Sequence, residues 1–495
     1  MVFEQSNVTI RGISGRTFGG SDVTLIITVD DVLLRLKGTR YQIKDITFSC
    51  PIDARTASVG LMFSRIDNPD STTESALASI DSKVENCQFY NLWRGIYVLG
   101  NQIRLSDLSF SRCIQGMAFD TFTGASPMYY GSNGRSYVIS RCNFHSMVST
   151  NIANGCIVIL NRDCICFQIS GCHQDCETHF IVGQALTRST VEDNMIANVT
   201  QGGIRVSRIY NSIITGNSFL SSLGTDNPVI DDNPSNRLRQ GIYATVDAFS
   251  STISNNYFDN CNMEHIRLEK SLNITITGNV FRRWGQSTTE ANKCALWLPG
   301  ITTKVTVTAN VFEQDTQANS YLAYIQSGLY SVFSDNTVNT KNGAKIVRIT
   351  IGETVNACLS NNNNITPDIN VPTTDNISSI ASVTNKEGFF YVYNNSNGMP
   401  PGIITANIIV RRINIDQFLK VLLPYDLSYG VWTQTVNITN STITKWTPMN
   451  KALIKPIVSY TNFDATDTGA LHFDGTTLKV WNGTAWVNLD GTPLT

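Results

Sequence analysis

A short phrase occurs twice in the middle of the chain, 23 residues apart. It reads Ile-Ser-Asn-Asn-Tyr-Phe at 253–258 and Ile-Thr-Gly-Asn-Val-Phe at 276–281. Each copy follows a brief apolar alternation, as at Ile242 and Ala244. A unit this short cannot enclose a core of its own, so it must bury its apolar side chains by stacking on its neighbours. The repeat therefore predicts a solenoid.

The same pattern, apolar-x-x-(Asn or Cys)-x-(Phe or apolar), can be followed along most of the chain. Its shortest intervals are 21 to 23 residues, and longer intervals fit the same coil with an inserted loop. Apolar and polar residues alternate with the period of two that is typical of strands. Coils spaced by about 4.8 Å would make a rod about 55–60 Å long. The fourth position is occupied by Ile46, Cys87, Leu108, Cys142, Cys172, Asn194, Asn217, Asn256, Asn279, Asn310, Asn336 and Asn362.

The repeated Asn and Phe residues are expected to form columns inside the solenoid. An Asn amide in one coil can bond to its equivalent in the next, which satisfies a buried polar group. Phe residues two positions later would stack likewise. Cys87, Cys142 and Cys172 stand at the Asn position, so we expect them to be small buried thiols.

Composition excludes several classes of partner. Charged residues make up 15% of the chain and the net charge is -2, so nothing favours nucleic acid or an anionic membrane. No apolar run approaches the roughly 18 residues of a membrane-spanning helix, and the first residues lack the plan of a signal peptide. We expect no nucleic-acid partner and no membrane insertion. Because the chain opens directly in strand-like sequence, we also expect a further segment before residue 1.

One segment could hold zinc on composition alone, Cys164-Ile-Cys166 with Cys172, Cys176 and His179. Strand alternation, however, should point Cys172 inward and Cys166 outward, which does not fit the closed geometry of a structural zinc site. The cysteines are dilute and irregular, unlike a disulfide framework. We therefore expect no metal and no cofactor.

The regular pattern ends near residue 362, and a link rich in Pro, Asn and Ser follows at 366–400. The stretches 403–423 and 431–444 read as longer strands without the 22-residue period. Two turn signals, Asp474-Gly475 and Asn482-Gly483, predict a small meander near the end of the chain. We expect a solenoid over 1–375, a separate β-rich region over 376–450, and a meander within 451–495.

The coil pattern of residues 1–375 resembles the pectate-lyase-type right-handed parallel β-helix. Together with the β-rich C-terminal region, it is similar to bacteriophage tailspikes. The stretch FDGTTLKVWNGTAWVNL at 473–489 resembles a motif common at the C-terminal ends of phage structural proteins. The resemblance implies an all-β chain with a single-stranded right-handed parallel β-helix of about 12 coils. It also implies a homotrimer, with 376–450 as the trimerisation region.

What the resemblance implies for function is a virion tail protein that binds, and usually cleaves, the O-antigen or capsular polysaccharide of a bacterial host. The segment before residue 1 would attach it to the tail or baseplate. Such proteins assemble in the reducing host cytoplasm, which fits free cysteines. The chain departs from two relatives on this fold. It lacks the Asp-Asp, His-Gly and Arg-x-Lys set of polygalacturonases, and also the calcium-binding aspartates of pectate lyases, so both chemistries are disfavoured.

The alternation of side chains along the strands predicts one row of outward residues. If Ile266 and Leu268 point inward, their neighbours His265, Arg267 and Glu269 point outward. The equivalent outward positions in neighbouring coils form a row of cations and aromatic rings. Rings stack on sugars, and arginines bind acids and hydroxyls in a fork. The alternative is a row of ordinary surface residues or one buried between subunits. The candidates for sugar contact are Arg205, Tyr243, His265, Arg267, Trp297 and Trp284.

Hydrolysis of a glycosidic bond needs two carboxyl groups. Glu269 and Asp247 flank the row on adjacent coils, with backbones about 8 Å apart, a separation suited to inversion through a water. Glu264, at the start of the strand, could replace either one. Each of these acids could instead be a solvated surface group or an ion-pair partner, as Glu269 with Arg267. Further acids lie on loops or earlier coils, at Asp120, Glu177, Asp226, Asp231, Asp232 and Glu290.

Three functions remain open on the sequence. The first is an endo-glycosidase that uses Glu269, Asp247 and Glu264. The second is a polysaccharide lyase, in which Arg267 or Arg205 stabilises a uronate and Tyr243 or His265 moves the proton. The third is an adhesin without catalysis. An esterase is unsupported because the chain has no G-x-S-x-G motif.

Overall fold

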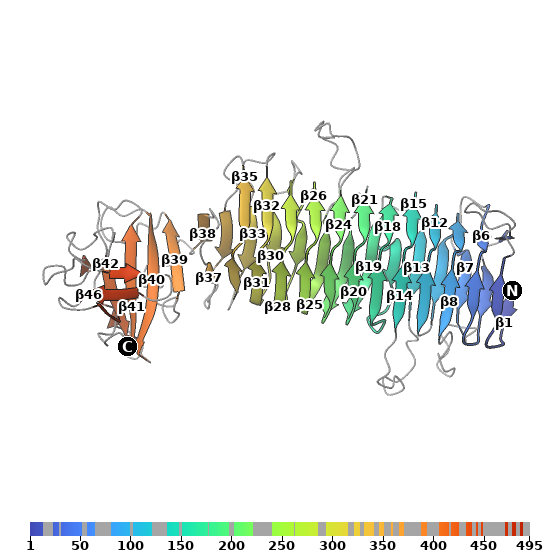
Figure 1. Ribbon diagram of the computed structural model, residues 1–495, viewed down its shortest axis with the longest axis horizontal. Coiled ribbons are helices and arrows are strands. Elements are labelled where there is room, and N and C mark those ends of the chain that lie inside the picture. Colours follow the sequence, from blue (N-terminus) through green and yellow to red (C-terminus); the bar gives the residue numbers. More distant parts are fainter. Residues whose placement is uncertain are drawn as a thin grey trace. The chain divides into compact units, whose positions relative to one another are not determined.

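The computed structural model describes strands throughout the chain, and the strands of successive coils lie side by side along the N-terminal unit (Figure 1). Up to residue 340 it describes all residues except 13–22, 29–30, 52–56, 65–80, 100–101, 121–135, 148–150, 177, 198–201, 221–239, 262, 286–293, 315–320 and 327–330. Beyond residue 340 it describes the strands alone. No helix among these residues is long and apolar enough to cross a membrane.

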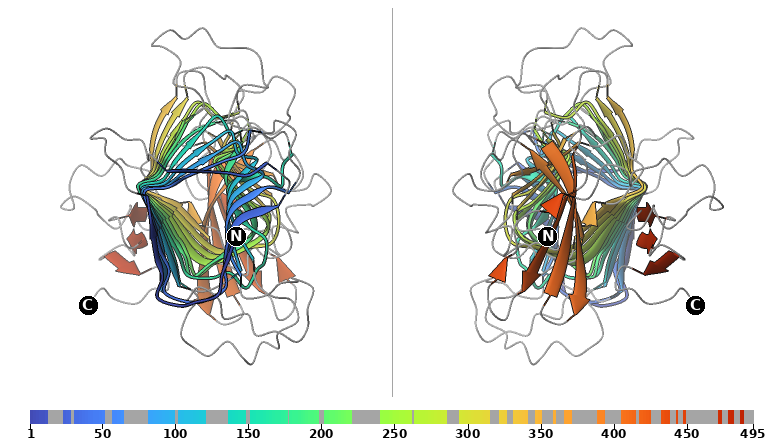
Figure 2. Two further views of the ribbon diagram at one scale, coloured as in Figure 1. Left: turned by 90° about the vertical axis from the view of Figure 1, so that its right-hand side faces the viewer. Right: turned by 90° about the vertical axis from the view of Figure 1, so that its left-hand side faces the viewer.

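Each coil contributes a strand to each of three faces, and strands of successive coils pair in parallel. Viewed end on, the strands of one face lie behind one another (Figure 2). The first face contains β1 (Val2–Phe3), β4 (Val32–Leu36), β7 (Val59–Phe63), β10 (Arg94–Val98), β13 (Gln115–Phe119), β16 (Gly155–Ile159), β19 (His179–Thr187), β22 (Ile204–Tyr210), the start of β25 (Ile242–Ser254), β27 (Ile266–Leu268), β30 (Cys294–Leu298), β33 (Tyr321–Gln326), β36 (Ile346–Thr350) and β38 (Thr366–Asn370).

The second face belongs to the same 26-stranded sheet, because β25 continues from one face into the other. Its other strands are β2 (Thr9–Arg11), β5 (Gln42–Lys44), β8 (Ser82–Glu85), β11 (Ile103–Ser106), β14 (Tyr137–Ser140), β17 (Phe167–Ser170), β20 (Thr190–Glu192), β23 (Ile213–Thr215), β28 (Ser271–Thr277), β31 (Thr302–Thr308), β34 (Val332–Ser334) and β37 (Cys358–Leu359).

The third face is a 12-stranded sheet in the described part of the chain, which confirms the predicted parallel β-helix of about 12 coils. Its strands are β3 (Thr24–Ile26), β6 (Thr47–Ser49), β9 (Gln88–Tyr90), β12 (Ser109–Ser111), β15 (Asn143–His145), β18 (His173–Asp175), β21 (Met195–Ala197), β24 (Ser218–Leu220), β26 (Tyr257–Asp259), β29 (Val280–Arg282), β32 (Val311–Gln314) and β35 (Thr337–Thr340).

The predicted Asn column lies buried between the second and third faces. The Nδ2 group of Asn279 donates to Asn310 Oδ1 and to the Ile253 carbonyl, both at 3.0 Å. Its Oδ1 accepts from the backbone and side-chain amides of Asn256, also at 3.0 Å. The same bonds run from Asn194 to Asn336. A fully bonded amide removes the cost of burying it. The predicted member Asn362 lies outside the described residues.

Cysteine takes the place of Asn in earlier coils, as predicted. Cys87, Cys142 and Cys172 are buried, and each thiol contacts a backbone carbonyl. Burial raises the pKa of the Cys87 thiol to about 12, so it stays protonated and unreactive.

The predicted Phe column stacks beside the Asn column. Ring centres of Phe219 and Phe258 are 4.7 Å apart, and those of Phe258 and Phe281 are 5.3 Å apart. Such pairs contribute about 0.5–1.5 kcal/mol beyond the area they bury. The column is interrupted where Gln174 and Ile196 replace Phe, and there Phe180 of the first face packs edge-on against Phe144.

A sharp corner joins the second face to the third, and the residue before each Asn or Cys position turns it with a positive φ. Asp, Asn and Gly recur here because they adopt this conformation most easily. At Gly278 an added Cβ would lie 2.4 Å from the side-chain oxygen of Asn255 in the preceding coil. The corner residues are Asp45, Asn86, Asp107, Arg141, Gly171, Asp193, Gly216, Asn255, Gly278, Ala309 and Asp335.

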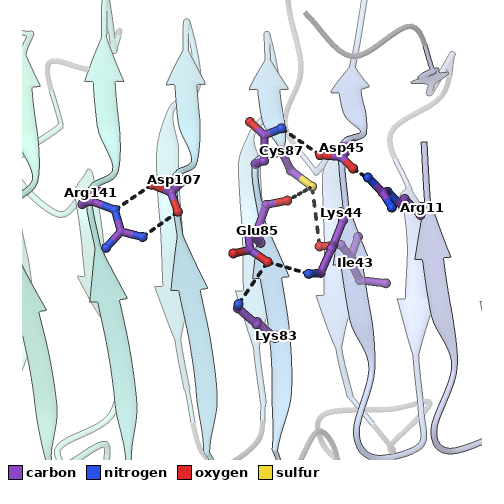
Figure 3. Close-up of polar contacts among 10 residues, drawn as sticks. Arg11, Ile43, Lys44, Asp45, Lys83, Glu85, Cys87, Asp107 and Arg141 are labelled. Atoms are coloured by element: carbon purple, nitrogen blue, oxygen red, sulfur yellow. Dashed lines mark hydrogen bonds and ion pairs between the residues drawn. The ribbon is translucent and has the colours of Figure 1, made fainter. Parts of the chain in front are cut away.

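Figure 3 shows the N-terminal part of this corner, where charged side chains link successive coils. Arg11 and Asn86 donate to Asp45 from the coils on either side. Arg141 makes two bonds of 2.7 Å to Asp107. Several of these side chains line an open hollow. Its acidic side chains already pair with basic side chains of neighbouring coils, so the contacts link one coil to the next.

The chain divides into two compact units, and the second contains residues 367–495. Its described strands form two antiparallel sheets, as the longer strands and turn signals predicted. One is β39 (Gly388–Tyr393), β40 (Thr405–Asn414), β41 (Gln417–Pro424), β42 (Trp432–Asn437), β43 (Thr442–Ile443) and β44 (Thr447–Pro448); the other is β45 (Leu471–Phe473), β46 (Leu478–Trp481) and β47 (Trp486–Asn488). The domain boundaries at 375 and 450 stay predictions.

Candidate functional site

A row of outward side chains crosses five strands of the first face. All of its members are partly exposed, and the residues before and after them within the strands are buried. The predicted alignment is confirmed by the strand register, which adds one residue that the sequence analysis missed, Tyr324. We call this set the Arg–aromatic row. From one coil to the next it consists of Arg205, Tyr243, Arg267, Trp297 and Tyr324.

The side chains of the row stack on one another. The guanidinium carbons of Arg205 and Arg267 lie 5.2 Å and 4.9 Å from the centre of the Tyr243 ring. They come from the strands on either side of β25, so both faces of that ring are covered. The rings of Trp297 and Tyr324 are 4.3 Å apart and within 16° of parallel. A ligand at Tyr243 would therefore meet its hydroxyl edge and not an open ring face.

Glu269 follows β27 and is held by its neighbours through a single oxygen. Its Oε1 accepts bonds from the Tyr243 hydroxyl at 2.9 Å and from two nitrogens of Arg267 at 2.7 Å and 2.6 Å. No donor among the described residues contacts its Oε2, and the side chain is 27% exposed. The carboxylate is thus fixed in place with one oxygen left for a ligand or a water.

The electrostatics agree with this arrangement. Burial alone would lower the pKa of Arg267, but the charges of Glu264 and Glu269 outweigh it and raise that pKa. Burial raises the pKa of Tyr243, and its hydrogen bond to Glu269 raises it further. Arg267 therefore stays charged, and Tyr243 stays protonated as a donor.

Asp247, the predicted partner of Glu269, belongs to a neighbouring group on the coils of β22 and β25. It follows an irregularity in the pairing of β25 with β22 and lies opposite Arg208. Its Oδ2 accepts a bond of 3.2 Å from the Tyr210 hydroxyl, and its Oδ1 is 3.6 Å from Arg208 Nε. The two acids thus have separate partners, and their predicted separation of about 8 Å stays a prediction.

Glu264 is a correction to the sequence analysis. It has no exposed surface, and its carboxylate accepts a bond of 3.2 Å from Gln240. One of its oxygens lies 3.9 Å from Arg267 Nη1. A carboxyl enclosed in this way cannot reach a polysaccharide, so the catalytic role considered for it is wrong. It contacts Arg267 from the interior and helps to keep that guanidinium in the row.

His265 is a second correction, with a clear physical reason. It was predicted to point outward, but it is fully buried and stacks between Phe258 and Phe281 at 5.5 Å and 5.8 Å. Burial lowers its pKa to about 3. The alternation rule fails here because the position two residues before each member of the Arg–aromatic row faces the Phe column. At Gly241, the equivalent position in the preceding coil, an added Cβ would lie 2.6 Å from the Phe258 ring.

The sequence did carry a signal for this inward column. Its other members include several glycines, which leave room for the Phe rings: Gly60, Gly95, Gly116, Gly203 and Gly241. A recurrent glycine two positions before the row marks a close approach of backbone to ring, not an exposed site.

Trp284 is a third correction. The sequence analysis named it as a sugar contact, but it is completely buried. Its ring packs edge-on against Phe312 at 6.1 Å and His265 at 6.3 Å. The indole therefore closes the core behind β29 and contacts no ligand.

The first face carries a second Arg–Tyr–acid group, of which the sequence analysis named only the acid, Asp120. Tyr97 occupies the position equivalent to the row in an earlier coil. Arg94 lies 4.7 Å from its ring, and its hydroxyl donates to Asp120 at 3.1 Å. Burial, followed by the charge of Asp120, raises the pKa of Tyr97. The earlier candidates Glu177, Asp226, Asp231, Asp232 and Glu290 lie outside the described residues.

The cysteine-rich segment has the orientation that alternation predicted, with Cys172 buried and Cys166 half-buried. In the described part of the chain, no three His, Cys, Asp or Glu side chains come close enough to hold a metal ion.

Comparison with known families agrees with the fold. Residues 128–312 match the family described as the right-handed β-helix region. No curated protein matches the sequence. The predicted right-handed parallel β-helix is therefore confirmed.

Among solved structures, the chain resembles the Dettilon tailspike protein, with 10% identity, a TM-score of 0.44, and coverage of 100% of this chain and 84% of that one. It also resembles the tailspike protein of E. coli bacteriophage HK620 in complex with a pentasaccharide, with 12% identity, a TM-score of 0.45, and 89% and 84% coverage. A third is the DFA-IIIase from Arthrobacter chlorophenolicus A6 without its lid, with 13% identity, a TM-score of 0.32, and 66% and 69% coverage. Two of these three structures are tailspike proteins.

Proposed function

We propose that this chain is a phage tailspike that binds bacterial surface polysaccharide, O-antigen or capsule, and hydrolyses it as an endo-glycosidase. The observation that carries the proposal is the state of Glu269. One of its oxygens is anchored by Tyr243 and Arg267, while the other has no donor among the residues that the structure describes. Structural ion pairs on a surface seldom need such anchoring, whereas a catalytic carboxylate must be held in a defined position.

In this proposal Glu269 acts as the general base or nucleophile. One oxygen of Glu269 accepts three hydrogen bonds, which suits this carboxylate to receive a proton or to attack the sugar. Asp247 in the adjacent coil is the candidate for the acid that protonates the leaving oxygen. Tyr243 and Arg267 orient Glu269, and the exposed edges of the Arg–aromatic row bind sugar hydroxyls on either side.

Two observations favour hydrolysis over elimination. A lyase needs a base that removes a proton next to the uronate carboxyl. Tyr243 has a raised pKa and already donates its proton to Glu269, so it is a poor base at neutral pH. His265 is enclosed in the core and reaches no substrate. Both proton carriers of the lyase hypothesis are thus weakened, whereas Glu269 remains accessible.

The proposal includes a homotrimer, attachment to the virion tail, and assembly in the host cytoplasm. Light scattering of the purified chain measures the subunit number directly. A monomer that nevertheless cleaves polysaccharide would remove the trimer from the proposal and leave the hydrolase.

The test is Glu269→Gln, assayed on a panel of purified capsular and O-antigen polysaccharides. Gln keeps the hydrogen-bonding shape but cannot act as base or nucleophile, so we expect the formation of new reducing ends to fall by about 10²–10⁴-fold or more. Binding to the same polymer should remain. The matched control is Glu313→Gln on the third face, where Glu313 pairs with Arg282 at 3.0 Å; it should keep full activity.

The outcomes separate the three candidate functions. New reducing ends without an unsaturated product indicate hydrolysis, and the ultraviolet absorbance of an unsaturated uronate indicates a lyase. Binding without any cleavage by the unmodified chain leaves an adhesin. Full activity of Glu269→Gln would show that the catalytic acid and base lie elsewhere.

A further inference from the structure

The arginines of the first face near Glu269 differ in how far their charge is neutralised. Arg267 has two carboxylates, Glu269 at 2.6 Å and Glu264 at 3.9 Å. Arg208 has Asp247 at 3.6 Å. Each of these guanidinium groups is therefore already matched by protein acids, and a ligand anion near them would meet a neutral or negative site.

Arg205 is different. No carboxylate among the described residues pairs with it, and its guanidinium packs on one face of the Tyr243 ring at 5.2 Å. On its other side the equivalent residue of the preceding coil is Val182, which is apolar and 5% exposed. The strand and the ring hold this cation in place, and they leave the edge of its guanidinium free.

A guanidinium held in this way is suited to binding an anionic group of a ligand. Stacking on an aromatic ring occupies the face of a guanidinium but leaves its N–H fork, which matches a carboxylate or phosphate. The chain as a whole carries a net charge of -2, so this site would recognise an anion locally and not by general attraction.

We infer that the polysaccharide bound by the Arg–aromatic row is anionic, and that Arg205 binds an acidic substituent on the sugar one coil before Glu269. The carboxyl group of Glu269 occupies the proposed cleavage point, so the acidic substituent binds beside that point and not at it. This inference rests on the proposed function and specifies the class of its substrate.

The test begins with the polymer that the unmodified chain cleaves, and with the same polymer after chemical reduction of its carboxyl groups to alcohols. Removing one charged hydrogen-bonded contact should weaken binding by about 10- to 100-fold. We expect Arg205→Gln to raise KM by this factor on the native polymer with little change in kcat. On the reduced polymer, Arg205→Gln and the unmodified chain should have the same KM.

Two comparison variants make the result specific. Arg205→Lys keeps the charge but loses the fork, so its KM should lie between the other two. Arg188→Gln removes an exposed cation at the turn after β19 and should behave as the unmodified chain. Added salt should raise KM for the unmodified chain and much less for Arg205→Gln, because screening weakens a contact that the variant lacks.

The outcomes distinguish this inference from the function beneath it. Cleavage of a neutral polymer, or equal KM values for the native and reduced polymers, would overturn the inference while leaving the hydrolase intact. If the activity requires an acid that carboxyl reduction does not remove, phosphate groups are the ligand, and removal of phosphate should then abolish the effect of Arg205. Failure to bind any polysaccharide would overturn the proposed function together with the inference.

Discussion

The Asn column makes a sharp stability prediction at Asn279. Replacement by Ala removes four hydrogen bonds of 3.0 Å, two that its amide donates and two that its oxygen accepts. It also removes a longer contact of the amide with the Thr277 carbonyl at 3.2 Å. The backbone and side-chain groups that lose their hydrogen-bond partner are buried, so water cannot take the place of the missing amide. At about 1 kcal/mol for each bond, the free energy of unfolding should fall by roughly 4 kcal/mol.

The assay is thermal unfolding followed by circular dichroism, supported by guanidinium titration. The entropy of unfolding is about 2 cal/mol/K per residue, so for 495 residues each 1 kcal/mol shifts the melting temperature by about 1 °C. Asn279→Ala should therefore melt about 4 °C lower than the unmodified chain. Because large β-helices can unfold irreversibly, all variants are compared at one scan rate.

Two further variants separate the column from general effects. Asn143→Ala on β15 removes an exposed Asn of the third face and should leave the melting temperature unchanged. Asn279→Cys should cost less than Ala, since Cys172 fills this position in an earlier coil and its thiol contacts the Ser170 carbonyl at 3.6 Å. If Asn279→Ala has the same melting temperature as Asn143→Ala, the Asn column contributes no net stability and the reasoning fails.

Two other predictions concern the inward column. His265 has a folded-state pKa of about 3 against an ordinary 6.5, so the unfolded chain binds the extra proton between these values. Stability should therefore fall on acidification from pH 6.5 towards 3, by up to about 1.4 kcal/mol per pH unit. His265→Phe should flatten the dependence of the guanidinium midpoint on pH over that window; an unchanged slope would rule His265 out as its source. At Gly241 a Cβ would lie 2.6 Å from the Phe258 ring, so Gly241→Val should cost about 1–3 kcal/mol or more in unfolding titrations, and a neutral result would contradict the packing.

The sequence predicted those features whose physical cause recurs in every coil. The Asn and Phe columns require the same side chain about every 22 residues, so a single chain displays the requirement many times. Mid-strand parity is similarly local: side chains alternate because the backbone is pleated, and the row from Arg205 to Trp297 followed from that alone.

The alternation rule failed at the start of a strand, because the backbone there is still turning from the preceding face. His265 was placed outward by counting back one residue from Ile266, but it lies in the interior. Glu264 was named only for its place at the start of the strand, and it is buried as well. Trp284, which follows the end of β29, was named without an argument for its direction, and it is buried too. In each case the orientation depends on which Phe ring or cavity lies opposite, and that is a property of two coils together.

The period, the buried columns and the outward row were thus determined by the sequence, because each arises from one coil repeated. Only the tertiary structure decided which charges meet between coils. It joined Tyr243 to Glu269 across 26 positions and stacked Arg205 on the Tyr243 ring. Within the described residues it gave no donor to the second oxygen of Glu269 and no acid to Arg205. Those contacts depend on side chains of adjacent coils packed at a few ångströms, which no spacing within a single coil encodes.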